Sequence, residues 1–136
     1  DSYAFINLWT ARLAQLRLGR RSRALPEGWA DTVRAGCERA RLDAAANQQP
    51  DFWSTAVVGD CDILLALLAG RMSATDQASA TEAYRAAFAR GGSAREHASV
   101  IDHLDFLIDL GLLRAGLEKV RNALSTNGSS GTKEQQ

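Results

Sequence analysis

The sequence predicts an all-α fold in which three antiparallel helix pairs stack as a short superhelix. Three stretches begin with a helix-capping residue and end on a glycine roughly five helical turns later; they are 1–19, 51–70 and 93–111. A second helical pattern follows each stretch, with apolar or small residues at i, i+4 and i+7. Its members are Val33, Cys37 and Ala40, then Ala80, Tyr84 and Ala87, then Gly116, Val120 and Ala123. No segment alternates polar and apolar residues as a half-buried strand does.

The first helix pair is predicted over residues 3–18 and 29–47. Residues 3–18 carry an apolar stripe with a period of about 3.6 residues, made of Phe5, Ile6, Trp9, Leu13 and Leu16. The inward face of 29–47 is mostly small, which allows close helix packing; its members are Trp29, Val33, Gly36, Cys37, Ala40 and Ala44.

The second pair begins with the most apolar helix of the chain. Asp51 follows Pro50 and is a suitable N-cap for a helix over 52–69. Apolar residues nearly encircle this helix, which is typical of a central helix buried on several sides. Ser73 and Asp76 mark the start of the next helix, which we expect to end near Arg90 with Tyr84, Ala87 and Phe88 facing inward.

The third pair begins at a capping box, Ser93 with Glu96 three positions later. We expect one helix up to residue 110 and a last one over 112–124. Residues 125–136 contain no apolar side chain and cannot bury surface to offset their ordering entropy. The domain organisation is therefore predicted as a helical repeat domain over 1–124 and a flexible polar tail over 125–136.

Composition narrows the functional classes. The chain has 136 residues, enough for one domain with a core, and its 16 basic and 16 acidic residues cancel. A neutral chain is not expected to bind nucleic acid or an anionic membrane, which usually require a basic surface. Basic residues do gather near the first loop, without interleaved aromatics, at Arg17, Arg20, Arg21 and Arg23. Cys37 and Cys61 are interpreted as small buried residues of a cytoplasmic protein.

Motifs of catalysis are not apparent. The glycines cap helices rather than form a phosphate loop, and no nucleophile elbow or metal-ligand spacing occurs. We therefore expect no enzyme activity, no catalytic residues, no cofactor and no metal site. His97 and His103 are interpreted as structural histidines, because they do not share a helix face.

Several segments carry a resemblance to a known family. The spacing of Ala80, Tyr84 and Ala87 matches the second helix of tetratricopeptide repeats. More specific are three segments in order along the chain: 1–7 (DSYAFIN), 50–53 (PDFW) with Ala56 and Asp60 following, and 98–107 (ASVIDHLDFL). Together they resemble the TRAFs-binding domain, a tetratricopeptide-like helical array of the apoptosis signal-regulating kinases and of bacterial proteins. Ala4 stands where that family usually has proline, and Asp60 where it usually has glutamate.

The resemblance implies a regulatory scaffold that binds other proteins. We therefore expect a module that binds a protein or peptide partner. We expect it to be part of a larger signalling protein, and that protein to be bacterial. The alternative is a structural spacer or self-association domain, hence a homo-oligomer, and the third possibility is a catalytic domain. Candidate partner-binding residues are Trp9, Trp53, Asp60 and Tyr84. Asp60 has two interpretations: it fixes helix packing through a hydrogen bond, or it faces a groove and meets the partner.

Overall fold

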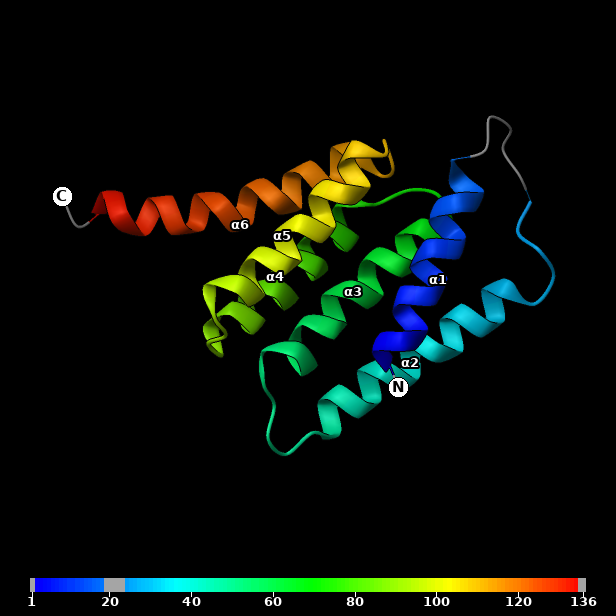
Figure 1. Ribbon diagram of the computed structural model, residues 1–136, viewed down its shortest axis with the longest axis horizontal. Helices are drawn as coiled ribbons and strands as arrows, with labels where there is room; N and C mark the ends of the chain where they lie inside the picture. Colours follow the sequence, from blue (N-terminus) through cyan, green and yellow to red (C-terminus); the bar gives the residue numbers. More distant parts are fainter. Residues whose placement is uncertain (1, 19–23, 135–136) are drawn as a thin grey trace.

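The computed structural model describes residues 2–18 and 24–134 (Figure 1). Every regular element in this part of the chain is a helix, which confirms the all-α prediction. The finer expectation of a tetratricopeptide-like superhelix stays a prediction. The helices are α1 (Ser2–Arg17), α2 (Trp29–Ala46), α3 (Phe52–Ala69), α4 (Ala74–Ala89), α5 (Ala94–Asp109) and α6 (Arg114–Glu134).

Helix boundaries follow from local capping chemistry. The side chains of Asp51, Ser73 and Ser93 each accept a hydrogen bond from the backbone N–H three residues later, and their own backbone N–H groups donate to the side chain of that later residue, so all three form capping boxes. At the other end of α3, Gly70 takes a left-handed conformation with φ of 81°, which glycine adopts without steric cost. These signals span only a few residues and are readable from sequence.

Helix α3 is the centre of the fold. It packs against α1, α2 and α4, while α4 and α5 pack against α6 (Figure 1). Both cysteines are buried and free: Cys37 of α2 lies against Cys61 of α3, whose thiol is 3.8 Å from the Cys37 carbonyl oxygen. Arg17 links the ends of α1 and α3 by donating to the carbonyls of Leu67 and Leu68. The other three arginines of the predicted basic cluster lie outside the described residues.

Helix α3 is long and apolar enough to cross a membrane, judged by length and composition alone. No other helix among the described residues meets this criterion. Core helices of soluble proteins pass the same test, and 61% of this segment is buried inside the structure. The helix also carries Asp60 and Asp62 near its middle. The match is therefore weak evidence for a membrane span.

Helix α6 is longer than the sequence predicted. It continues to Glu134, whereas we expected it to end at Leu124. A helix satisfies its hydrogen bonds internally and can continue into solvent where no proline stops it. Figure 1 shows this end of α6 projecting away from the other helices. That residues 125–136 form a flexible tail stays a prediction, and residues 135–136 lie outside the described residues.

Candidate functional site

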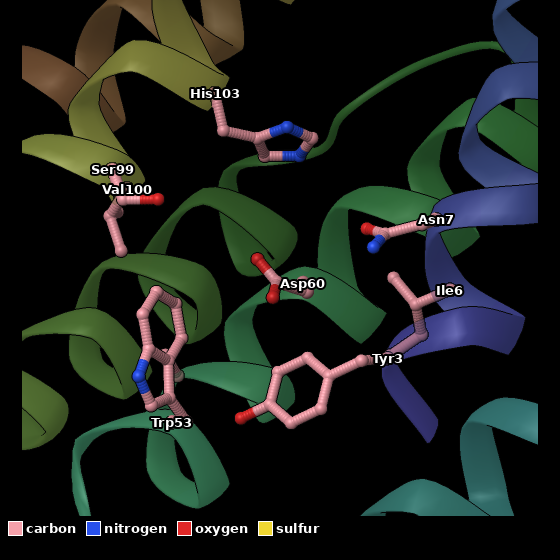
Figure 2. A pocket seen from close by; sticks show the side chains of 9 residues that line it. Tyr3, Ile6, Asn7, Trp53, Asp60, Ser99, Val100 and His103 are labelled. Carbon is pink, nitrogen blue, oxygen red and sulfur yellow. The ribbon is translucent and has the colours of Figure 1, made fainter. Parts of the chain in front are cut away.

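A pocket of about 280 Å³ opens between α1, α3 and α5. Each helix contributes residues separated by about one turn, so that one face of each helix lines the pocket. Figure 2 shows the side chains converging from both sides of Asp60. The lining residues are Tyr3, Ile6 and Asn7 of α1, Trp53, Ala56 and Asp60 of α3, and Ser99, Val100 and His103 of α5.

Asp60 supplies the carboxylate of the pocket. Its Oδ1 accepts a hydrogen bond of 2.6 Å from the hydroxyl of Tyr84, a fully buried residue of α4. Gly59 permits this approach, because a Cβ there would lie only 2.8 Å from the Tyr84 ring. Burial raises the pKa of Asp60, and the Tyr84 hydrogen bond and the nearby His103 partly offset that rise.

Aromatic side chains form one wall. Trp53 remains 38% exposed and packs against Tyr3 in a T-shaped arrangement, with ring centroids 6.1 Å apart. Trp53 also packs against Phe52 in a T-shaped arrangement, with ring centroids 5.0 Å apart. Burial, reinforced by the charges of Asp51 and Asp60, raises the pKa of Tyr3, so its hydroxyl is neutral at physiological pH. These contacts hold Trp53 in place and leave part of its surface open.

Polar side chains approach Asp60 from both sides. Figure 2 shows the Asn7 amide on the α1 side, and Ser99 and His103 on the α5 side. Ser99 is exposed and His103 is half-buried. Ser99, His103 and Asp60 are the residue types of a hydrolytic triad, but within the described part of the chain no hydrogen bond joins any two of them, so the relay of such a triad is not formed. No group of three metal-ligating side chains occurs among the described residues either.

Two of the four predicted partner-binding residues meet in this pocket, namely Trp53 and Asp60. Trp9 and Tyr84 do not, and here the expectation is corrected. Trp9 is 7% exposed and packs edge-on against Trp29 with centroids 5.1 Å apart, while Tyr84 is fully buried beneath Asp60. Both lie on the apolar stripes that face the core, so neither offers surface to a partner. Tyr84 reaches the pocket only through its hydrogen bond to Asp60.

Sequence reasoning missed several residues of the pocket. Tyr3, Asn7 and Ser99 were not singled out, and His103, interpreted as structural, also lines the pocket. His97 does have a structural role: it stacks on Phe88 at 4.3 Å and lies 2.6 Å from the Gly91 carbonyl oxygen. A signal was present, because every lining residue falls within the segments that carry the family resemblance. In comparisons with known proteins, no family model, no curated protein and no solved structure matches the chain.

Proposed function

We propose that this chain is a protein-binding module of a larger regulatory protein and that the pocket between α1, α3 and α5 is its contact site. The observation that carries the proposal is the pocket itself. In it the partly exposed Trp53 and the half-buried carboxylate of Asp60 converge with several polar side chains. Its lining residues are all among those that underlie the resemblance to the TRAFs-binding domain. No catalytic role is part of the proposal.

The composition of the pocket supports a protein or peptide ligand. Binding hot spots are enriched in tryptophan and tyrosine that fill partly desolvated hollows and are surrounded by polar groups. Trp53 is held by contacts with Tyr3 and Phe52 and needs no rearrangement to expose its ring. Because the walls are helices rather than loops, the site is preformed, which reduces the entropy lost on binding.

A peptide selection tests this function. The whole chain is used to select from a random peptide library, and the affinity of the selected peptides is measured by fluorescence polarisation. We expect Trp53→Ala to weaken binding at least tenfold, because it removes the aromatic wall. Phe106→Ala is the matched control: Phe106 is 58% exposed on α5 but does not line the pocket, and its loss should change affinity less than twofold.

Two results would contradict the proposal. Equal losses with Trp53→Ala and Phe106→Ala would show that the pocket is not the contact site. Failure to select any peptide, together with dimers at micromolar concentration in analytical ultracentrifugation, would favour the alternative of a self-association domain.

A further inference from the structure

The pocket has the chemistry of a site for a primary ammonium group. Resting on the function proposed above, we infer that it takes the side chain of a lysine from a partner protein, with the ammonium group against Asp60 and the methylene stem against the exposed part of Trp53, beside Tyr3.

Charge makes the site selective for a cation. Asp60 is the one acidic residue among those that line the pocket, and neither lysine nor arginine is among them. His103 is the basic group that faces it. A carboxylate removed from water is attracted to a cation more strongly than an exposed one, because the local dielectric is lower. Because neither lysine nor arginine lines the pocket, a ligand that brings a positive charge adds a second counter-charge to that of His103.

The hydrogen bonds of Asp60 leave room for that ligand. Tyr84 occupies Oδ1 from the core side at 2.6 Å, and no other hydrogen bond to this carboxylate exists among the described residues. Asp62, two positions along the same helix, is different: Arg41 binds one of its oxygens and Ser79 binds the other. Asp62 is therefore already neutralised within the fold, whereas Asp60 keeps acceptor capacity on the side of the pocket.

Lysine fits this geometry better than arginine. A guanidinium binds a carboxylate best as a planar fork across both oxygens, and Tyr84 already occupies one of them. An ammonium is a point charge with three donors; it can bind the remaining oxygen of Asp60 and also the side-chain oxygens of Asn7 and Ser99, which flank it in Figure 2. The rings of Trp53 and Tyr3 suit an aliphatic stem that ends in a cation.

Small probes test the inference without a known partner. The probes are Nα-acetyl-lysine amide, its arginine analogue, and the norleucine analogue, which keeps the stem but has no charge. Binding is followed by NMR through the indole N–H of Trp53 and the backbone amides of α1, α3 and α5. We expect saturable shifts with the lysine probe in the millimolar range, at least fivefold weaker binding of the arginine probe, and none for norleucine. Asp60→Asn should abolish the shifts while circular dichroism stays unchanged.

A second pair of variants does not touch Asp60. Ser99→Lys places an ammonium inside the pocket and should weaken the lysine probe at least tenfold. Ala98→Lys adds the same charge one position earlier on α5, where the side chain is exposed and does not line the pocket. It should leave affinity within twofold, so that general charge repulsion is separated from occupation of the site.

The outcomes separate this inference from the proposed function. Selected peptides that need Trp53 but contain no lysine, and bind Asp60→Asn as well as the native chain, would leave the function standing and overturn the lysine site. Equal binding of the lysine and arginine probes, or shifts confined to other surfaces, would also overturn it. Tighter binding of free spermidine than of a lysine-containing selected peptide would assign the ammonium site to a small-molecule amine and overturn the partner assignment.

Discussion

Asp60 and Asp62 lie two positions apart on α3 and face different neighbours. Side chains two positions apart on a helix point in directions that differ by about 200° around the helix axis. Asp62 is 6% exposed, and its two oxygens bind Arg41 of α2 at 2.5 Å and Ser79 of α4 at 2.8 Å. Asp60 is half-buried, binds Tyr84 of α4 through one oxygen, and lines the pocket. Burial raises the pKa of both carboxyls.

The difference shows how a structural carboxylate can be told from one that is available to a ligand. Both side chains lose hydration, and a raised pKa alone does not distinguish them. What distinguishes them is whether the chain supplies a full set of partners. Asp62 binds the guanidinium of Arg41 and the hydroxyl of Ser79, and so connects α2, α3 and α4. The further partners that Asp60 lacks would come from a bound ligand. The following variants test this contrast.

The largest effect is expected from Arg41→Met. It leaves Asp62 buried with only Ser79 as a partner, and an unpaired buried charge is strongly destabilising. Because Arg41 is itself 40% exposed, water partly screens the pair, and we expect a loss of about 2 kcal/mol in the free energy of unfolding at pH 7, measured with urea. Arg34→Met, at an exposed position of the same helix, should change it by less than about 0.5 kcal/mol. Equal effects of the two variants would contradict the structural role of Asp62.

The second comparison removes one hydroxyl donor from each carboxylate. Tyr84→Phe keeps the buried ring but removes the donor to Asp60, and we expect a loss of about 1–2 kcal/mol because a buried acceptor is left unsatisfied. Ser79→Ala removes the donor to Asp62, but Ser79 is exposed and Arg41 remains bound. Its cost should be below about 1 kcal/mol. A larger cost for Ser79→Ala in thermal unfolding would reverse the comparison.

Asp60→Asn tests the pH dependence. A carboxyl whose pKa is raised by folding binds its proton more tightly in the folded state, so its stabilising effect is present below the unfolded value, near 3.8, and is lost as the pH rises through the raised folded pKa. Asparagine keeps an oxygen for Tyr84 and does not titrate. The variant should therefore gain stability relative to the native chain as the pH rises through this window. At pH 7 it should be at least as stable as the native chain, and a loss above about 1 kcal/mol there would show that the charge of Asp60 stabilises the fold.

Local signals explain how much of the fold could be predicted. The capping boxes at Asp51, Ser73 and Ser93 act over three residues, and the bounds of α3 follow directly from Asp51 and Gly70. The end of α6 could not be predicted, because polar composition indicates a lack of packing and does not by itself indicate a lack of helix.

The site was predictable only in part. Asp60 attracted notice as an acid on an apolar helix, but Asp62, on the same helix, did not. Its partners lie 21 and 17 positions away in the sequence and meet it only in the folded chain. Large aromatic residues were ambiguous for a related reason: Trp9 and Trp53 both belong to apolar patterns, and only the packing of their helices in the folded chain decides which one is buried.

The smallest effect is expected at a third carboxylate, Asp105 of α5. Arg121 of α6 donates to it at 2.5 Å, the same distance as in the pair between Arg41 and Asp62. Both side chains of this pair are more than one-third exposed, at 36% and 38%. Water and salt screen such a pair and weaken its attraction.

A double-mutant cycle with Arg121→Met and Asp105→Asn should therefore give a coupling energy of about 0.5 kcal/mol, falling further in 1 M NaCl. The same cycle with Arg41→Met and Asp62→Asn should give a coupling at least twice as large and nearly independent of salt, because Asp62 is buried. Urea unfolding of all variants at low and high salt provides the measurement. If the two cycles agree, distance rather than burial decides the strength of these pairs, and the contrast between Asp60 and Asp62 would have to rest on the count of hydrogen bonds alone.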